Sequence, residues 1–291
     1  MKILVLGGTN FFGKKAVQRL LDHGHQVTIA TRGNKKNPFV GRASHILLDV
    51  KQENHSGWKL IQAQQWDAVF NNICYTREEA ERMVEVLSGL TDHVYFTSSM
   101  AVYGDQIGGF LEADFDPLTY TIDPTIEVTY GEGKRQVESV LFKQNNFKVT
   151  AFRFPIVLDD DDYTQRLHHY VDKALKKEVI EVYNLDAHVN YLKGTMAADS
   201  IVWAIENAVE GILNVSSNQP VPFNQMLNWL EEAVGHDLQV VVKGGIDYAP
   251  LSTRHNQYLV PDKVENLGFQ INSLADWMPD LMKRLAEELS R

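Results

Sequence analysis

Side chains that could together transfer a proton lie in two short segments of this sequence. Tyr130 and Lys134 are four residues apart in TYGEGKRQVE, and Ser98-Ser99 lies upstream in YFTSSMAVYG. In a helix, a spacing of four residues places the phenol and the ammonium on one face. A free tyrosine has a pKa of about 10, so it is a poor base at neutral pH unless a nearby cation favours its phenolate.

Lys134 can supply that cation. A serine hydroxyl near the phenol could hydrogen-bond the substrate oxygen while the proton is transferred. The alternative is an ordinary amphipathic helix in which Tyr130 and Lys134 occur together by chance. The position of these residues in the fold decides between the two interpretations.

A glycine-rich segment, Gly-Gly-Thr-Asn-Phe-Phe-Gly at 7–13, follows the first apolar run and precedes the first helical pattern. Glycine lets the backbone approach a pyrophosphate, whose charge a helix N-terminus favours. Asn10 occupies a position where glycine is more usual, and Asn tolerates left-handed backbone angles better than most residues. We therefore predict a dinucleotide site here, with Gly13 allowing close helix–strand packing. The predicted contacts are Gly7, Thr9, Asn10, Phe11, Phe12 and Gly13.

The end of the second predicted strand bears on the choice of dinucleotide. A carboxylate there would bind the adenosine ribose of NAD and repel a 2′-phosphate. The chain instead has Arg32, followed by Lys35 and Lys36, and a guanidinium can bind phosphate with two parallel hydrogen bonds. This favours NADP, with NAD as the other possibility, whereas the alternative is a solvated basic turn. Asp49, at the end of the third predicted strand, could accept a hydrogen bond from the adenine amino group.

Short apolar runs alternate with helical patterns along the first half of the chain. The expected strands are 2–6, 26–32, 44–50, 66–73, 93–99 and 147–155, and the expected helices 12–21, 77–90 and 129–144. This order is typical of a parallel sheet covered on both faces. We predict an α/β fold, a Rossmann-type doubly wound parallel sheet with a small C-terminal substrate lobe. The dinucleotide-binding domain is expected at 1–155 plus about 190–217, and the substrate lobe at about 156–189 plus 218–291.

The composition excludes several classes of protein. With 44% hydrophobic and 23% charged residues the chain is typical of a globular protein, and its net charge of −10 argues against a nucleic-acid partner. The single cysteine, Cys74, excludes an intramolecular disulfide and a zinc site of several thiolates, and we expect it to be a small buried apolar residue. No apolar run reaches the roughly 18 residues of a membrane span, and strand-like sequence begins at Met1-Lys2. We expect a cytoplasmic protein without a signal peptide.

Two further groups of residues are of a type that can bind metal ions. The four adjacent carboxylates of Asp159 to Asp162 do not match the spacing of a calcium loop, so we expect a solvated loop. His168 and His169 are neighbours on a predicted helix, where their side chains diverge. We therefore predict no metal site.

These motifs together resemble the extended short-chain dehydrogenase/reductase superfamily, in its NAD-dependent epimerase/dehydratase branch. The resemblance runs from Met1 to about Asn218. GGTNFFG is similar to the glycine loop of that branch, SSMAVYG to its serine strand and YGEGK to its catalytic helix. GGTNFFG with TRG most resembles the subgroup that includes plant chloroplast stem-loop RNA-binding proteins.

The resemblance implies a role for each matching residue. Ser99 would be the serine of a catalytic triad, with Ser98 as the alternative if the register shifts by one. Tyr130 would be the acid/base that exchanges the hydroxyl proton of the substrate while hydride moves to or from a nicotinamide. Lys134 would bind the nicotinamide ribose and keep Tyr130 acidic. The backbone near Asn71 would contact the cofactor.

The implied function is that of an NAD(P)-dependent oxidoreductase, epimerase or dehydratase acting at a carbinol or carbonyl carbon of a small molecule, such as a nucleotide sugar. Homodimers are common in this superfamily. Two departures weaken the sugar assignment: Asp159 to Asp162 stand near the usual Gly-Pro, and the C-terminal lobe is short. The alternative is a non-catalytic NAD(P)-binding regulatory or RNA-binding protein on the same fold. The acidic composition argues against general RNA binding, and the Ser-Tyr-Lys set argues against a sensor.

Overall fold

The computed structural model describes residues 1–291, which form two compact units. Unit 1 consists of Met1–Gly104, Glu112–Phe154 and Thr195–Asn214. Unit 2 consists of Asp105–Leu111, Pro155–Gly194 and Val215–Arg291. The chain therefore passes from one unit to the other several times, and each unit is described by itself below.

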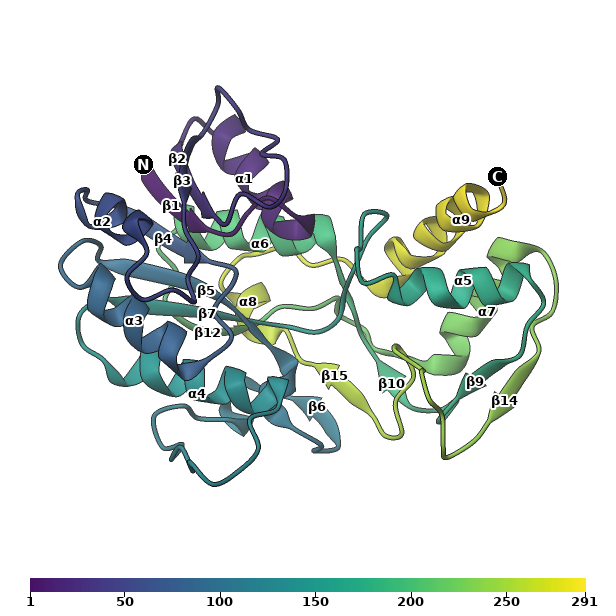
Figure 1. The fold of residues 1–291 in the computed structure, drawn as a ribbon. Helices are drawn as coiled ribbons and strands as arrows, with labels where there is room; N and C mark the ends of the chain where they lie inside the picture. The colour runs from purple at the N-terminus through teal and green to yellow at the C-terminus, as the bar shows by residue number, and fades with distance from the viewer. The chain divides into compact units, whose positions relative to one another are not determined.

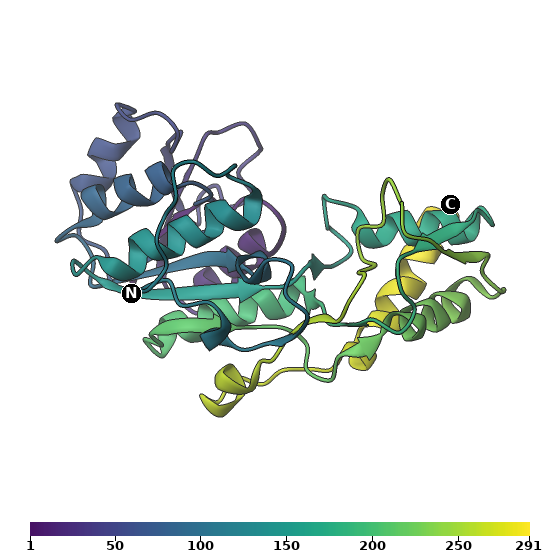
Figure 2. The same ribbon diagram turned by 90° about the horizontal axis from the view of Figure 1, so that it is seen from below.

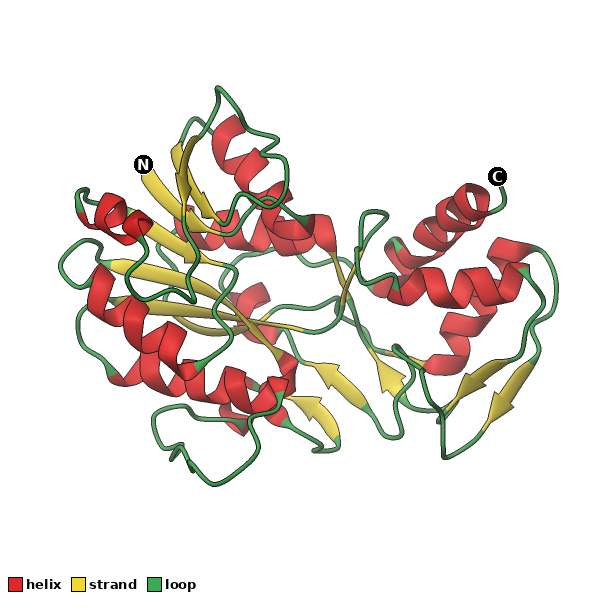
Figure 3. Ribbon diagram, in the orientation of Figure 1, coloured by secondary structure: helices red, strands yellow, loops and turns green.

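Unit 1 contains a seven-stranded sheet in which every strand runs parallel to its neighbours (Figures 1 and 3). Its order is β12-β7-β5-β4-β1-β2-β3. The strands are β1 (Lys2–Leu6), β2 (Gln26–Thr31), β3 (Ser44–Leu47), β4 (Ala68–Asn71), β5 (His93–Ser99), β7 (Lys148–Phe154) and β12 (Gly211–Asn214). The predicted Rossmann-type parallel sheet is confirmed.

Helices cover both faces of this sheet, as continuous apolar strands require. On one face lie α1 (Phe11–Asp22) and α6 (Gly194–Glu206) (Figure 1). An ion pair between Arg19 and Asp199 joins these two helices. On the other face lie α2 (Ser56–Gln62), α3 (Arg77–Leu87) and α4 (Tyr130–Lys143), and α3 and α4 are side by side in Figure 2. The short helix α2 was not predicted, because its seven residues span fewer than two turns.

The order of the strands determines where a ligand can bind in unit 1. Strand order reverses between β1 and β4, so the connections that follow these two strands leave in opposite directions. In open α/β sheets, a crevice forms at such a reversal, outside the carboxyl ends of the strands. The glycine segment follows β1 and the segment from Asn72 to Thr76 follows β4, so both border this crevice.

Unit 2 is a smaller lobe of mixed sheet and helices. Its four-stranded sheet has the order β13 (Val221–Pro222), β10 (His188–Val189), β15 (Gln257–Leu259) and β6 (Gly108–Phe110). Two strand pairs accompany it: β11 (Leu192–Lys193) with β8 (Val157–Leu158), and β14 (Val240–Val242) with β9 (Ile180–Val182). The helices are α5 (Arg166–Leu175), α7 (Phe223–Val234), α8 (Asp262–Asn266) and α9 (Met278–Leu289).

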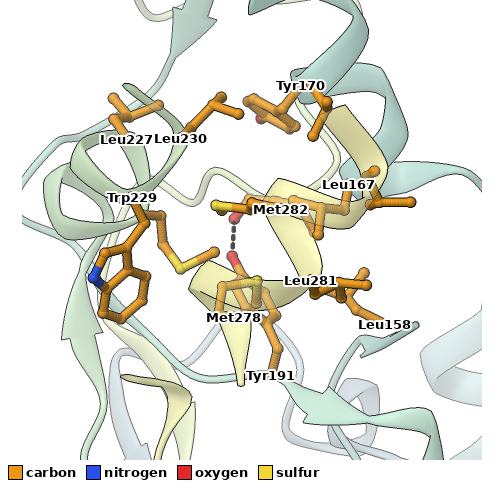
Figure 4. Packing of buried hydrophobic residues seen from close by; sticks show 14 of the residues in the cluster. Leu158, Leu167, Tyr170, Tyr191, Leu227, Trp229, Leu230, Met278, Leu281 and Met282 are labelled. Atoms are coloured by element: carbon orange, nitrogen blue, oxygen red, sulfur yellow. Dashed lines mark hydrogen bonds between the residues drawn. The ribbon is translucent and has the colours of Figure 1, made fainter. Parts of the chain in front are cut away.

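The core of unit 2 lies where α5, α7 and α9 pack together (Figure 4). Leu167 from α5, Leu230 from α7 and Leu281 from α9 are almost completely buried there. Tyr191 is buried among them, and its hydroxyl donates to the carbonyl oxygen of Leu251 at 2.6 Å. None of the helices in the protein combines the length and apolar character that a membrane span requires.

The aspartate run at 159–162 begins directly after β8 and is not the solvated loop expected from the sequence. Asp159 and Asp162 are buried, and Asp162 accepts hydrogen bonds from the backbone N–H and the hydroxyl of Thr164 at 2.9 and 2.6 Å. Asp160 is exposed and pairs with Arg284 at 3.0 Å. The carboxylates turn the chain into α5 by satisfying local donors. No group of His, Cys, Asp or Glu in the structure is arranged to hold a metal ion.

A buried chain of hydrogen bonds ties the start of β5 to β7. The hydroxyl of Tyr95 and Nδ1 of His93 are 3.0 Å apart, and Nε2 of His93 lies 2.8 Å from the hydroxyl of Thr150. Thr150 donates to the carbonyl oxygen of Val209 at 2.5 Å. Thr150 can therefore accept from Nε2, and Tyr95 can donate to Nδ1, which requires a neutral imidazole. Burial lowers the pKa of His93 to about 4.

We expect His93 to make the fold sensitive to mild acid. The unfolded chain, with a His pKa of about 6.5, takes up a proton before the folded chain, so stability is retained above pH 6.5 and lost as the pH falls towards 4. The free energy of unfolding should drop by about 2 kcal/mol from pH 7 to pH 5 through this residue alone. Urea unfolding of wild type and His93→Gln at both pH values measures this. An equally steep pH dependence in the variant would contradict it.

Candidate functional site

The glycine segment forms a tight turn from β1 into the N-terminus of α1. Gly7 and Gly8 have φ angles of 97° and 86°, which residues with a Cβ rarely adopt. A Cβ on Gly13 would lie 2.6 Å from Nδ2 of Asn72 and 3.4 Å from Cα of Gly8, so a side chain there would displace the Asn72 amide. This agrees with the close packing predicted for Gly13. The N-terminus of α1, where the helix dipole favours an anion, therefore comes close to the end of β4.

Asn10 does not have the left-handed conformation that the sequence suggested. Its φ and ψ angles are −139° and 149°, which is extended backbone, and its side chain makes no capping hydrogen bond to α1. The left-handed residue is the next one, Phe11, at φ 47°. Phe11 is buried, and its ring packs edge-on against that of Phe12. Burial of this aromatic ring offsets a conformation that is unfavourable for a residue with a Cβ.

A basic depression lies beside this turn. It has a volume of about 520 Å³ and is lined by Thr9, Lys14, Lys36, Asn37, Pro38 and Val40. Arg32, which was predicted to contact a phosphate, is exposed directly after β2 but does not line it. Lys14 was missed in the sequence, although it directly follows the last glycine of the segment. Two lysines therefore border a hollow next to the helix N-terminus.

Other predicted contact residues follow β3 and β4. Asp49 lies two residues beyond β3, and its carboxylate accepts from the backbone N–H of Lys51 at 3.2 Å. Asn71 ends β4 with its side chain buried, and it accepts from the N–H of Ile73 at 2.9 Å. The side chain of Asn71 thus stabilises the turn after β4. The predicted contact with a cofactor concerns the backbone at this position.

The N-terminus of α4 is held against the segments that follow β4 and β5. A Cβ on Gly131 would lie 2.6 Å from the carbonyl oxygen of Ala101, and one on Gly133 would lie 2.7 Å from that of Tyr75. Thr129 caps the helix by accepting from the N–H of Glu132 at 3.3 Å. The two glycines of YGEGK therefore let the helix approach the ends of two strands.

Tyr130 and Lys134 lie near each other at this end of α4. Tyr130 is the first residue of the helix and 57% exposed, whereas Lys134 is only 1% exposed. The Nζ atom of Lys134 donates to the carbonyl oxygens of Cys74 and Thr97, each at 2.7 Å. The same atom is 5.9 Å from the centroid of the Tyr130 ring. The spacing of four residues thus brings the ammonium and the phenol ring together as expected.

The surroundings of Lys134 change its protonation. Burial lowers the pKa of Lys134 to about 8, because an ammonium loses its hydration there. Burial also raises the pKa of the Cys74 thiol to about 12, and Cys74 is 1% exposed. The prediction that Cys74 is a small buried residue is confirmed. With a pKa of about 8, Lys134 still carries its charge in most molecules at pH 7.

The two serines at the end of β5 have different surroundings. Ser98 is buried, and its hydroxyl donates to Oε1 of Glu138 at 2.5 Å. Ser99 is partly exposed, and its hydroxyl oxygen accepts from the N–H of Ala101 at 3.2 Å. Successive strand residues point to opposite faces. Ser98 is therefore held inside unit 1 by its hydrogen bond to Glu138. Ser99 only accepts in its bond to Ala101, so that bond leaves its hydroxyl hydrogen available to donate.

Below this site lies a buried polar network that the sequence did not reveal. Ser98, Arg153 and Asn214 are paired across β5, β7 and β12 at the carboxyl end of the sheet. Glu138 of α4 meets Arg153 in an ion pair at 2.6 Å, and both side chains are completely buried. Arg153 and Glu138 are separated by fifteen residues on different elements, so no local spacing pattern marks them as partners.

All five N–H groups of the Arg153 guanidinium have acceptors. Two bind Glu138 at 3.0 and 2.6 Å, and one binds the hydroxyl oxygen of Tyr103 at 2.9 Å. The other two bind the carbonyl oxygens of Glu112 and Phe115, both at 2.9 Å. A charge buried this fully is tolerated only when its hydrogen bonds are complete. Arg153 thus fixes α4, the end of β7 and the segment from Glu112 to Phe115 to one another.

Comparison with known proteins identifies the family. The profile described as the NAD dependent epimerase/dehydratase family matches residues 3–216. The chain belongs to this family. Its members bind NAD(P), which agrees with the glycine turn at the N-terminus of α1. The resemblance predicted from the sequence motifs is confirmed.

Individual relatives of this family member are distant. The chloroplast stem-loop binding protein of 41 kDa b of Arabidopsis thaliana is 26% identical over 252 residues, which cover 80% of this chain and 63% of that protein. The chain thus spans less than two thirds of the length of this relative. The match is in line with the subgroup suggested by GGTNFFG and TRG.

Solved structures with the same fold include sugar-nucleotide epimerases. UDP-glucose 4-epimerase of Thermotoga maritima, with UDP-glucose, has a TM-score of 0.76 at 18% identity, covering 99% of this chain and 100% of that one. UDP-glucuronic acid 4-epimerase of Bacillus cereus, in complex with NAD, has a TM-score of 0.75 at 16% identity, covering 100% and 96%. At these identities the likeness shows the fold alone.

Proposed function

We propose that this protein is an NAD(P)-dependent enzyme that transfers hydride and a proton at a carbinol or carbonyl carbon, as an oxidoreductase, epimerase or dehydratase. The observation that carries the proposal is the position of Lys134. Its ammonium is buried, held by two backbone carbonyls at 2.7 Å and lies 5.9 Å from the Tyr130 ring. A lysine with a purely structural role would not require an exposed phenol beside its ammonium.

In this proposal each residue has a separate task. Tyr130 exchanges the proton of the substrate hydroxyl, and its phenolate is favoured both by Lys134 and by the N-terminus of α4. Ser99 donates a hydrogen bond to the substrate oxygen. Lys134 uses its remaining N–H for the ribose of the cofactor. When bound, the nicotinamide supplies the hydride chemistry.

The residues around the glycine turn are proposed to hold the dinucleotide. The N-terminus of α1 offers backbone N–H groups to the pyrophosphate. Unit 1 would be the dinucleotide-binding domain and unit 2 the substrate lobe. The proposed contacts are Gly7, Thr9, Asn10, Phe11, Phe12, Gly13, Arg32, Asp49, Asn71 and Lys134.

We further propose NADP as the preferred cofactor. Arg32 is exposed at the end of β2, and Lys14 and Lys36 line the depression beside the glycine turn. No carboxylate stands directly after β2 to bind a free ribose hydroxyl. The two lysines at this hollow, together with the exposed Arg32 directly after β2, favour a doubly charged 2′-phosphate.

Arg32→Asp should weaken NADPH binding by at least about tenfold, while NADH binding changes by less than about threefold. The variant loses the contact of the guanidinium with the 2′-phosphate and places a carboxylate there that repels it. NADH has no 2′-phosphate, so neither change affects its binding. Fluorescence titration of both reduced nucleotides measures the two affinities. Lys59→Asp, the same change of charge at an exposed position in the middle of α2, is the control. Equal losses for NADPH and NADH would mean that Arg32 is only a solvated charge.

For the substrate we propose a small molecule with a secondary alcohol or ketone, and a nucleotide sugar as the first class to test. Structures of the same fold contain UDP-glucose or UDP-glucuronic acid, which supports this choice. A panel of nucleotide sugars assayed with NADP and NAD, with epimer formation and nucleotide absorbance as readouts, tests the function. If no member of the panel turns over and no nicotinamide nucleotide binds, the enzymatic proposal is wrong.

A second candidate is a non-catalytic NAD(P)-binding regulatory or RNA-binding protein on the same fold. It is favoured by the similarity to the chloroplast stem-loop binding protein. The net charge of −10 argues against it, because phosphate backbones require a basic surface. A gel shift with stem-loop RNA that weakens with salt, in the absence of any cofactor-dependent chemistry, would reverse the ranking of the two candidates.

A further inference from the structure

We infer that Tyr75 is a positioning residue that keeps Lys134 in its charged form by presenting its aromatic face to the ammonium. The inference rests on the proposed function, in which Lys134 must be a cation beside Tyr130. It adds to that function a residue outside the Ser-Tyr-Lys set. Tyr75 lies directly after Cys74, in the segment between β4 and α3.

The geometry around the ammonium carries this inference. Nζ of Lys134 is 4.5 Å from the centroid of the Tyr75 ring, which is within the range of a cation–π contact. The Tyr75 and Tyr130 rings are 6.5 Å apart and tilted by 45°, so both rings lie close to the same cation. Tyr75 is the nearer of the two, because the Tyr130 centroid is 5.9 Å from Nζ.

The backbone also fixes Tyr75 in this place. The carbonyl oxygen of Cys74, one residue earlier, accepts a hydrogen bond from Lys134 at 2.7 Å. The backbone N–H of Tyr75 donates to Oε2 of Glu79 at 2.7 Å, and the absence of a side chain on Gly133 allows α4 to approach the Tyr75 carbonyl. The Cys74 carbonyl thus binds the lysine directly, while the hydrogen bond to Glu79 and the close approach of α4 fix the segment that carries Tyr75.

The other titratable groups facing Lys134 cannot replace the aromatic ring. The thiol of Cys74 stays protonated, because burial raises its pKa to about 12. Glu138 is paired with Arg153 and accepts from Ser98. Glu79 accepts from backbone N–H groups at the start of α3. The carboxylates act on Lys134 only from a distance, so the ring and the carbonyl oxygens are its immediate neighbours.

Two opposing effects therefore determine the charge of Lys134. Burial favours the neutral amine, whereas the negative face of an aromatic ring and two carbonyl dipoles favour the ammonium. The Tyr75 residue is 46% exposed, but the ammonium is buried, and a cation–π contact with a desolvated cation is strong enough to change a protonation equilibrium by about tenfold. Without the Tyr75 ring, Lys134 would lose much of its charge near neutral pH. The phenolate of Tyr130 would then lack its cationic neighbour.

Direct titration of Lys134 tests the inference without cofactor or substrate. Wild type with ¹³C-labelled lysine is followed by NMR against pH, and the Lys134 signal is assigned by its loss in Lys134→Met. The wild-type midpoint is expected near pH 8, in line with the lowered pKa of Lys134. Tyr75→Phe, which keeps the ring, should titrate within about 0.3 pH unit of wild type. Tyr75→Leu should titrate at least about one pH unit lower.

Tyr75→Trp extends the test in the opposite direction. Because indole binds cations best, its midpoint should be higher than that of wild type, and this variant keeps the inference testable if Tyr75→Leu does not fold. Circular dichroism checks the fold of each variant. The inference is overturned if Lys134 in a folded Tyr75→Leu variant titrates at the wild-type midpoint. If Tyr75→Leu does not fold, a wild-type midpoint in Tyr75→Trp overturns it. It is also overturned if the Lys134 midpoint in Tyr75→Phe shifts as far as in Tyr75→Leu. These outcomes are independent of the proposed function, which fails separately if no nicotinamide nucleotide binds.

Discussion

A Tyr130→Phe variant is expected to turn over the substrate about a hundredfold to ten-thousandfold more slowly than wild type, with nearly unchanged affinity for NAD(P)H. The ring remains beside Lys134, but the group that exchanges the proton is gone, and general acid–base catalysis contributes rates of this size. Steady-state kinetics on a nucleotide sugar that wild type converts, together with fluorescence titration of the reduced nucleotide, measures both quantities. Unchanged turnover would falsify the role of Tyr130.

The adjacent serines provide a matched pair of controls for this site. Ser99→Ala should lower turnover with little effect on stability, because the hydroxyl is proposed to bind the substrate oxygen. Ser98→Ala should leave turnover near wild type but lower the free energy of unfolding by about 1–3 kcal/mol, because Glu138 loses a buried hydrogen bond. The opposite pattern would mean that Ser98 is the catalytic serine.

A Glu138→Gln variant is expected to lower the free energy of unfolding by about 3–5 kcal/mol, the loss seen when one member of a buried ion pair is removed. Arg153 would keep its charge at zero exposure without a carboxylate to balance it. The same loss should loosen α4 and with it the position of Lys134. Urea unfolding followed by circular dichroism measures the change in stability.

Two further variants separate the buried charge from general damage. The double variant Glu138→Gln with Arg153→Met should be more stable than Glu138→Gln alone, because it removes the unpaired charge. Glu81→Gln breaks the exposed ion pair of Glu81 with Arg77 on α3 and should cost less than about 0.5 kcal/mol. A Glu138→Gln loss as small as that of Glu81→Gln would show that the network does not hold unit 1 together.

The parallel sheet could be predicted from the sequence because its signals are local. The residues from Ile3 to Leu6 form an unbroken apolar run, and all of them are completely buried in β1. The glycines of GGTNFFG and the spacing of Tyr130 and Lys134 are likewise short motifs. Each lies within one turn or one helix, so the pattern alone indicates the local structure.

Features that depend on contacts between residues far apart in the chain could not be predicted from the sequence. The pair Arg153 and Glu138 forms only when α4 packs on β7. The sequence around each residue does not distinguish it from an ordinary solvent-exposed charged residue. Phe11 combines a left-handed angle with a buried ring, a combination that no local propensity indicates. Asp159 and Asp162 were expected in solvent, but the chain folds over them. In each case tertiary packing determines the outcome and overrides local preference.

The most direct test of the central claim is a crystal structure of the wild-type protein with NADP⁺. We predict the pyrophosphate at the N-terminus of α1, the 2′-phosphate beside Arg32 or Lys36, and the nicotinamide ribose hydrogen-bonded to Nζ of Lys134. A dinucleotide bound away from the glycine turn, or a nicotinamide ring remote from Tyr130, would contradict the account.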